Sequence, residues 1–268
     1  MTDTNIGKAI EMIEFKPSYK VYRQIIRDIQ RTGKSCKYNE AHERDEFLIM
    51  RHDVEFSLER AYNLSLVESE MGFTSNYFVQ ITNNSYNALS KSGIDMMRDM
   101  ASRGHVIGLH YHLNGQTEAL AVRDGVRDQL RIMSEMVGLP IDTYSFHRPT
   151  KEVYYYKICI DGTYNAYGSE FFTYAENVDE NTKLDVKYIA DSKHRWNYGY
   201  PDYETFIKYP KIQLLLHPFS WSEEGHGNSD NFYYLIQEKQ TELIDTLDDE
   251  FLRFKEVRQE IETKLKLR

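Results

Sequence analysis

Cysteine is nearly absent from the sequence, which contains only Cys36 and Cys159. Two cysteines are too few for a disulfide framework, and they are not spaced like thiolate ligands of a metal, so we interpret both as structural residues. Long hydrophobic runs are absent too, since no apolar stretch approaches the roughly 20 residues needed to cross a bilayer. Because residues 1–8 lack the apolar core of a signal peptide, we predict a cytoplasmic protein without a membrane span.

Basic residues are also in deficit, with 33 Lys and Arg against 42 Asp and Glu and a formal net charge of −9. This balance argues against a surface that follows nucleic-acid phosphates or an anionic membrane, so we expect neither partner. Internal repeats, low-complexity tracts and linkers rich in Pro, Gly or Ser are missing as well. We therefore predict one domain over residues 1–268, with residues 1–45 as an N-terminal helical extension and residues 229–268 as a C-terminal amphipathic helix.

Short apolar strands alternate with helices along much of the chain. Strands are expected at residues 46–50, 75–80, 105–110, 143–146 and 212–216. The intervening segments have apolar residues at helical spacing, with Ser57 placed to cap one helix and Gly138 to end another. Such alternation implies βαβ crossovers and a parallel sheet, either doubly wound or closed into a barrel.

The C-terminal segment has apolar residues at spacings of three and four. They are Leu243, Leu247, Phe251, Phe254, Val257, Ile261 and Leu265. This pattern predicts a long amphipathic helix. Such a helix could cover the barrel or pair with a second subunit, which would make the protein a homo-oligomer.

Histidines gather at or just past the ends of the expected strands. Five of the nine do so: His52, His110, His112, His147 and His217. In a parallel barrel these strand ends converge on one face, where catalytic sites are built. Imidazole and carboxylate groups together suit zinc and similar divalent ions.

Asp53, His110 and His112 are the candidate metal ligands. The two histidines are two residues apart, so on a strand they point the same way. Asp53 follows a strand and is the leading carboxylate, with a salt bridge to Arg51 as the alternative fate of its charge. We therefore expect one divalent cation, zinc above others, bound near the barrel mouth.

Further candidates surround this group. His217 ends a strand and has a pKa range that suits a general acid. His147 and Arg148 could bind a substrate oxygen or orient a catalytic carboxylate, and Asp191 could orient one of the histidines. Trp221, like His52, is a candidate for substrate binding or for positioning a catalytic group.

Six segments, in order over about residues 46–221, resemble the motifs of the polysaccharide deacetylase superfamily, carbohydrate esterase family four. They are Arg51-His52-Asp53-Val54-Glu55, Asn76-Tyr77-Phe78-Val79, Gly104-His105-Val106-Ile107-Gly108-Leu109-His110-Tyr111-His112, Phe146-His147-Arg148-Pro149, Tyr188-Ile189-Ala190-Asp191-Ser192 and Leu215-Leu216-His217-Pro218. The third segment is the most specific. The resemblance implies a distorted, seven-stranded (β/α) barrel.

The first motif departs from the Asp-Asp-Gly of typical members, in which one Asp is the base and the next binds the metal. One register puts His52 at the base position and Asp53 at the metal position, whereas the other makes Asp53 and Glu55 the carboxylate pair. The chain is similar to a divergent branch with the motif Arg-His-Asp-Val-Asp. Asn114 stands where typical members have a second metal-binding His, so His112, His147 or water would complete the coordination.

The resemblance implies a metal-dependent hydrolase that removes an N-acetyl group from a sugar, with Asp53 or Glu55 as the base and His217 as the acid. The expected substrate is a precursor of a surface glycan such as O-antigen or capsule. Another metal-dependent amidohydrolase is one alternative, because His110-Tyr111-His112 imitates its His-x-His pair. A noncatalytic sugar-binding or assembly protein on the same barrel is the other.

Overall fold

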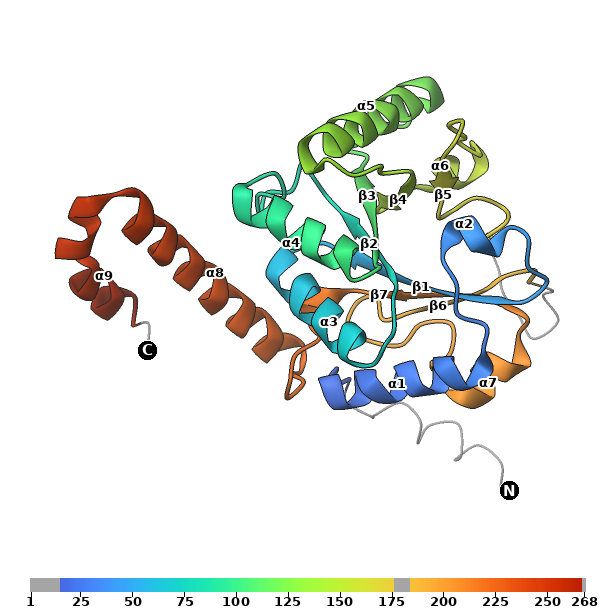
Figure 1. The fold of residues 1–268 in the computed structure, drawn as a ribbon, viewed down its shortest axis with the longest axis horizontal. Coiled ribbons are helices and arrows are strands. Elements are labelled where there is room, and N and C mark those ends of the chain that lie inside the picture. Colours follow the sequence, from blue (N-terminus) through green and yellow to red (C-terminus); the bar gives the residue numbers. More distant parts are fainter. Residues whose placement is uncertain (1–14, 176–183, 267–268) are drawn as a thin grey trace, which may run out of the picture.

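A curled sheet of seven strands forms the centre of the protein, seen in a computed structural model that describes residues 15–175 and 184–266 (Figure 1). The strands are β1 (Phe47–Val54), β2 (Asn76–Val79), β3 (Val106–His112), β4 (Thr143–His147), β5 (Tyr164–Asn165), β6 (Lys187–Ala190) and β7 (Lys211–Leu216). Their order is β5-β4-β3-β2-β1-β7-β6, and every pair is parallel. The prediction of an α/β, distorted seven-stranded barrel is confirmed, and β5 and β6 form the two edges of its open side.

Helices surround the sheet, and most of them cover its outer face. They are α1 (Tyr19–Thr32), α2 (Tyr38–Ala41), α3 (Leu58–Glu70), α4 (Lys91–Ser102), α5 (Ala119–Val137), α6 (Lys151–Tyr155) and α7 (Tyr203–Lys208), followed by the 3₁₀ turn η1 (Pro218–Ser220). The helix ends predicted at Ser57 and Gly138 are present: Ser57 Oγ accepts a hydrogen bond from the Arg60 amide, and Gly138 ends α5 in a left-handed conformation.

Successive side chains of β1 alternate between the outer face of the sheet and the interior of the barrel. Leu48 and Met50 face outward and pack in the cluster that includes α1 and α3, while Phe47 and Ile49 face inward and pack against Phe78 of β2. Because successive side chains of a strand point to opposite faces, the interior set continues with Arg51 and Asp53, toward the carboxyl end. The apolar floor of the barrel therefore gives way to polar groups at its mouth.

The N-terminal part described by the structure belongs to the core and is not an extension. Tyr22, Ile26 and Ile29 of α1 are fully buried against β1 and β7. The predicted extension over residues 1–45 is therefore corrected for the part from residue 15 onward, while residues 1–14 lie outside the described residues.

The C-terminal segment is a two-helix arm instead of one continuous helix. It consists of α8 (Asn228–Glu250), η2 (Leu252–Glu256) and α9 (Arg258–Leu265), and it projects away from the sheet (Figure 1). Acidic residues at the end of α8 oppose the helix dipole, and Arg258 pairs with Asp245 and Asp248 at 2.8 and 3.2 Å, which holds the returning chain against α8. Of the two alternatives, covering the barrel applies only to the first part of α8, where Glu238 and Lys239 contact Arg60 and Glu59 of α3.

Candidate active site

A cavity of about 660 Å³ opens at the carboxyl ends of the strands. Asp53, Glu55, His110, Asp191 and His217 line its inner part. These residues come from segments far apart in the sequence, and the parallel sheet brings them together because its strands all end on this face. We refer to this cavity as the cleft.

Asp53 is held by Arg51 at the inner end of the cleft. The Arg51 guanidinium donates from Nε and Nη2 to the two carboxylate oxygens of Asp53 at 2.8 and 2.7 Å, and both side chains are buried. Gln213 and Tyr167 accept further hydrogen bonds from Arg51, at 3.2 and 3.0 Å. Burial alone would raise the pKa of Asp53, but the guanidinium holds it well below its usual range, so the carboxylate stays ionised.

Glu55, His110 and His147 form a cluster of three groups that could hold a metal ion. One ligand atom from each lies within 4.8 Å of the others. Although burial would raise the pKa of Glu55, the neighbouring His147 and His217 hold it below its ordinary value. A carboxylate with two imidazoles is a donor set that zinc binds well.

Two buried nitrogen atoms in this cluster lack a hydrogen-bond partner, namely His110 Nε2 and His147 Nδ1. His147 Nδ1 lies 3.0 Å from Glu55 Oε1, but it is not aligned for a hydrogen bond. An unpaired buried polar atom is costly, and coordination of a cation would satisfy both nitrogens. The residues present therefore fit a divalent ion.

The other ring nitrogen of His110 is already engaged. Its Nδ1 lies 2.7 Å from Ser145 Oγ, and that hydroxyl lies 3.5 Å from Asp53 Oδ1. Burial lowers the pKa of His110 to about 4, so its ring is neutral at pH 7. A neutral ring that donates from Nδ1 leaves its Nε2 lone pair for a cation.

Two of the predicted ligands lie beside this cluster instead of within it. Asp53 Oδ2 is 3.7 Å from His110 Nε2, so the two side chains do face one region, but Asp53 is bonded to Arg51. His112 accepts a hydrogen bond at Nδ1 from the Asn114 amide at 2.9 Å, and its ring stacks near that of His147 at 4.7 Å between centroids. His147, expected to bind substrate, takes the place expected for His112.

His217 stands across the cleft mouth with Asp191 behind it. Asp191 Oδ1 is 2.6 Å from His217 Nδ1, and Asp191 also accepts hydrogen bonds from the His217 amide and from Trp221 Nε1. Burial would lower the pKa of His217, but the Asp191 carboxylate raises it to about 9. The imidazole is therefore protonated at pH 7, with Nε2 3.8 Å from Glu55 Oε1.

His52 does not reach the cleft. It points to the outer face of β1, where its Nε2 lies 2.9 Å from Glu68 Oε1 and its ring stacks on Tyr77. Tyr22 and Tyr77 donate hydrogen bonds to Glu68 as well. The register that made His52 the base is therefore corrected, because neighbouring residues of a strand face opposite sides.

Arg148 and Trp221 take different places. Arg148 is exposed and lines the outer cleft with a left-handed φ of 49°, and among the described residues no acidic side chain pairs with it. Trp221 is buried and touches the site only through its hydrogen bond to Asp191, so it positions that carboxylate.

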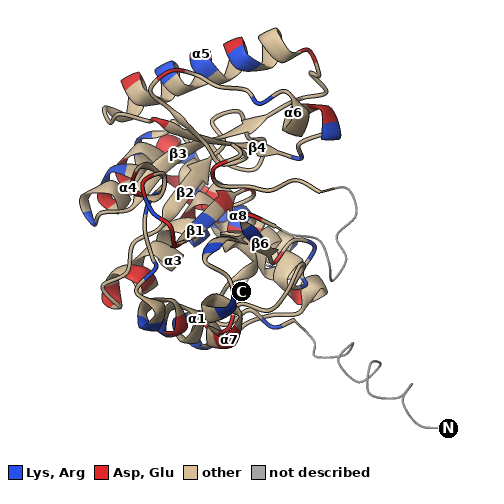
Figure 2. Ribbon diagram, turned by 90° about the vertical axis from the view of Figure 1, so that its right-hand side faces the viewer, with Lys and Arg blue, Asp and Glu red and all other residues tan. Residues whose placement is uncertain are grey.

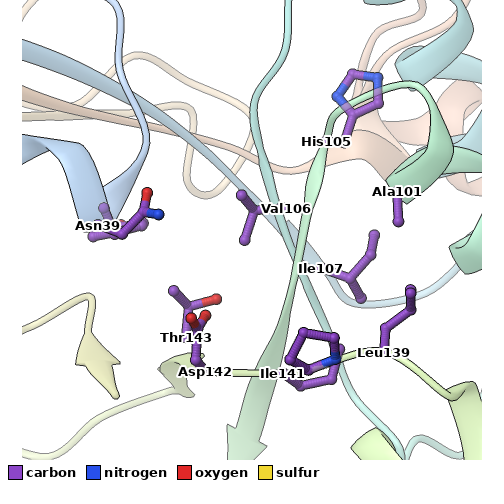
Figure 3. Close-up of a pocket in the computed structure, with 11 residues that line it drawn as sticks. Asn39, Ala101, His105, Val106, Ile107, Leu139, Ile141, Asp142 and Thr143 are labelled. Atoms are coloured by element: carbon purple, nitrogen blue, oxygen red, sulfur yellow. The ribbon is translucent and has the colours of Figure 1, made fainter. Parts of the chain in front are cut away.

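A second cavity, of about 240 Å³, lies at the opposite ends of the strands (Figure 3). Val106 begins β3 there, directly after His105, and Thr143 begins β4, directly after Asp142. Its lining is mostly apolar, and the metal-binding cluster found among residues 15–175 and 184–266 lies elsewhere. The groups that could hold a metal ion therefore lie at the cleft and not at this second cavity.

Four contributors to the site are absent from the sequence-based candidates. They are Arg51, Ser145, Gln213 and Tyr167, each of which positions another side chain of the site. Alternation gives a signal for three of them, since Arg51, Ser145 and Gln213 each lie two or four residues before a candidate on the same strand or at its end. Tyr167 lies in a segment of weak periodicity and has no such signal.

No family model matches the chain, and no curated protein matches it. The solved structures that match include the deacetylase PplD of Streptococcus pyogenes in complex with acetate, with 11% identity, a TM-score of 0.42 and coverage of 58% of this chain and 74% of that one. The chitin deacetylase of Colletotrichum lindemuthianum matches at 18% identity and a TM-score of 0.31, over 37% of this chain and 44% of that chain. A carbohydrate esterase family 4 pseudoenzyme of Bacillus anthracis matches at 10% identity and a TM-score of 0.42, over 74% and 61%.

The matching structures are of polysaccharide deacetylases, the family that the sequence motifs resemble, and they include a pseudoenzyme. This chain spans less than half of the fungal chitin deacetylase and less than two thirds of the pseudoenzyme. TM-scores of 0.42 or less carry no argument about activity, so the function has to be inferred from the residues of the cleft. None of the helices in the described residues is long and apolar enough to span a bilayer.

Proposed function

We propose that the protein is a metal-dependent carbohydrate N-deacetylase, a hydrolase that acts on a non-peptide C–N bond. The observation that carries the proposal is the buried Glu55, His110 and His147 cluster with two unpaired imidazole nitrogens. It lies between an ionised carboxylate, Asp53, and a protonated imidazole, His217. A site for a cation, a proton acceptor and a proton donor are the three parts that hydrolysis of an amide needs.

Glu55, His110 and His147 would hold the metal ion, and zinc suits this set of one oxygen and two nitrogen donors. Zinc bound there would lower the pKa of its water from about 15.7 to about 7 and polarise the acyl carbonyl. Ser145 orients His110 through Nδ1, so the chain presents Nε2 in one fixed direction.

Asp53 is assigned as the group that accepts the proton of the attacking water. Its carboxylate stays ionised because of Arg51, and its Oδ2 lies beside His110. Arg51 engages both oxygens and lowers the pKa of Asp53, so the carboxylate is a weak base that accepts a proton only through its remaining lone pairs. Glu55, the alternative base, is engaged in the cluster.

His217 is assigned as the group that protonates the leaving amine. Asp191 binds Nδ1, which leaves the protonated Nε2 facing the cleft. Because Trp221 and the His217 amide also bond to Asp191, the pair is held in one orientation. Acetate and the free amine of the sugar would be the products.

The proposed substrate is an N-acetylated sugar of a surface glycan or its precursor. Aromatic side chains such as Tyr154, Tyr198 and Phe232 line the outer cleft, and aromatic rings supply flat, apolar surfaces on which sugar rings stack. The proposed substrate within this class is a cytoplasmic glycan precursor of the O-antigen or capsule type.

The test measures acetate release from N-acetylated sugars by the purified protein, before and after chelation and zinc restoration. Activity should fall on chelation and return with zinc, and His110→Ala should lose about 10²-fold or more of kcat/KM. His42→Ala, at an exposed histidine outside the cleft, is the matched control. Metal and glycan binding without acetate release would instead identify a noncatalytic sugar-binding protein.

A further inference from the structure

Three basic side chains line the outer part of the cleft: Arg148, Lys193 and Arg195. All three are exposed, and none pairs with an acidic side chain within the described residues. We call them the basic rim. In a chain with a formal net charge of −9, a group of unpaired cations around one cavity is a local reversal of sign.

Basic residues of α5 show a different arrangement. Figure 2 shows both signs of charge interspersed along the outer helix α5, where Arg127 pairs with Asp124 at 2.8 Å and Arg131 with Glu135 at 3.0 Å. On that helix each cation has an acidic partner within one turn, whereas the rim cations have none in the described chain. The rim is therefore available to a ligand.

The acidic groups of the cleft do not neutralise the rim. Asp53 is paired with Arg51, Asp191 is paired with His217, and Glu55 belongs to the cluster with His147. Each of these carboxylates has a basic neighbour of its own at the inner end of the cleft. Within residues 15–175 and 184–266, the outer cleft therefore presents positive charge without a competing anion.

The backbone holds part of the rim in an uncommon conformation. Arg148 and Lys193 have φ values of 49° and 63°, and two other residues that line the cleft, His194 and Tyr198, have φ values of 52° and 66°. Left-handed conformations are costly for residues other than glycine, and they concentrate at ligand-binding sites. Local backbone strain therefore occurs at residues whose side chains line the cleft.

The rim also lies next to the groups that carry the chemistry. Arg148 directly follows His147 of the metal-binding cluster, and Lys193 and Arg195 follow Asp191, which holds His217. The cations thus come from two separate segments that both end at the cleft. An anionic group between them would lie beside the position of the acyl group.

We propose that the basic rim binds a phosphate group attached to the N-acetylated sugar, so that the substrate is a sugar phosphate or a sugar joined to a carrier through a diphosphate. The arginine fork matches phosphate oxygens in a bidentate manner, and several cations that line one cavity suit a dianion better than a single carboxylate. The cavity volume of about 660 Å³ is that of an ordinary ligand pocket and exceeds what a small fragment needs. The identity of the sugar in this inference rests on the proposed deacetylase function, whereas the phosphate site does not depend on it.

The first experiment measures binding of inorganic pyrophosphate to the metal-free protein by calorimetry, with chelator present so that binding to a metal cannot contribute. Arg195→Gln and Lys193→Gln should each raise the Kd about 10-fold, the loss expected when one charge-assisted contact is removed. Arg27→Gln, at an exposed arginine of α1, is the matched control and should leave the Kd unchanged. Absence of pyrophosphate binding, or equal affinity of all variants, would overturn the proposal.

The second experiment compares acetate release from N-acetylglucosamine, its 1-phosphate, its uridine diphosphate derivative and its polyprenyl diphosphate derivative in detergent micelles. We expect a KM at least 10-fold lower for the phosphate-bearing sugars, and a larger increase of that KM in Arg195→Gln than of the KM for the neutral sugar. The last two substrates distinguish a nucleotide carrier from a lipid carrier.

The two proposals fail in different ways. Acetate release from neutral and phosphorylated sugars with equal KM would overturn the phosphate site and leave the deacetylase function intact. Pyrophosphate binding that depends on Lys193 and Arg195, without acetate release from any sugar, would support the phosphate site and refute the deacetylase function.

Discussion

Replacement of Asp191 by asparagine should move the alkaline limit of activity toward neutral pH. The Asp191 carboxylate lies 2.6 Å from His217 Nδ1 and raises the pKa of that imidazole to about 9. Asparagine is nearly the same size but carries no charge, so burial would then act alone, and burial lowers the pKa of an imidazole. In the proposed mechanism the acid form of His217 protonates the amine, so the variant should lose activity at a lower pH than the parent.

The size of the effect follows from the protonated fraction of His217. At pH 8, a group with a pKa of about 9 is about 0.9 protonated, whereas a group at its ordinary value of 6.5 is about 0.03 protonated. The rate at pH 8 should therefore fall at least about 30-fold in Asp191→Asn, and by much less at pH 6. The difference between the two pH values separates titration of His217 from simple damage to the site.

The assay is the pH profile of kcat between pH 5 and 10 for the zinc-loaded protein, with circular dichroism as a check on folding. Asp128→Asn, at an exposed position on α5, is the control for loss of one surface charge. An Asp191→Asn profile that is lower at every pH but bends at the same alkaline pH as the parent would refute the assignment of His217.

Three further outcomes test other parts of the site. His147→Ala should lower bound zinc to well below one ion per chain, as measured by elemental analysis after gel filtration, whereas His112→Ala should retain about one ion, because only His147 belongs to the cluster. Arg51→Leu should lower the free energy of unfolding in urea by about 3–5 kcal/mol, because it leaves the buried Asp53 carboxylate without its partner. Ser57→Ala should lower the same quantity by about 1 kcal/mol, because Ser57 Oγ caps α3.

Each of these outcomes can be contradicted directly. Equal zinc content of the His147 and His112 variants would remove His147 from the cluster. Arg51→Leu within 1 kcal/mol of the parent would show that the Asp53 carboxylate has another source of stabilisation. An Arg51→Leu variant that also carries Asp53→Asn should recover part of the lost stability, since no buried charge is then left unpaired.

Much of the barrel could be predicted from the sequence because its strands are short apolar runs between well-capped helices. The expected segments 143–146 and 212–216 agree with β4 and β7 to within one residue. The first strand was expected to end at Met50 but continues to Val54, because Arg51 and Asp53 pair with each other and remain in the ladder. The salt bridge to Arg51, named from the sequence as the alternative fate of the Asp53 charge, is present, but its burial within the strand was not predicted.

The geometry of the metal-binding cluster was harder to predict, because it depends on pairing between strands. His112 and His147 are partners in the register of β3 and β4, 35 residues apart, so both are near the cleft. Which of them faces Glu55 follows from the curl of the sheet and not from the order of residues. The two-residue spacing from His110 favoured His112, and the resemblance left His112, His147 or water open, while the structure presents His147 to Glu55.

The C-terminal arm shows a second limit of sequence patterns. Spacings of three and four continue from Leu243 to Leu265, but periodicity alone does not reveal the break after Glu250. The acidic end of α8 and the contacts of Arg258 are the local features that favour a reversal.

Glu68, which is buried behind β1, restricts how that strand can be aligned in the sheet. Glu68 is fully enclosed and receives hydrogen bonds from Tyr22, Tyr77 and Ser75, and His52 is its only basic neighbour on β1 in the part of the chain that the structure describes. A shift of β1 by one position in one direction would bring Asp53 to Glu68, and two enclosed carboxylates would repel each other. Glu68 therefore disfavours the alignment that would turn Asp53 away from the cleft, and His52 is the residue that matches Glu68 in the alignment observed.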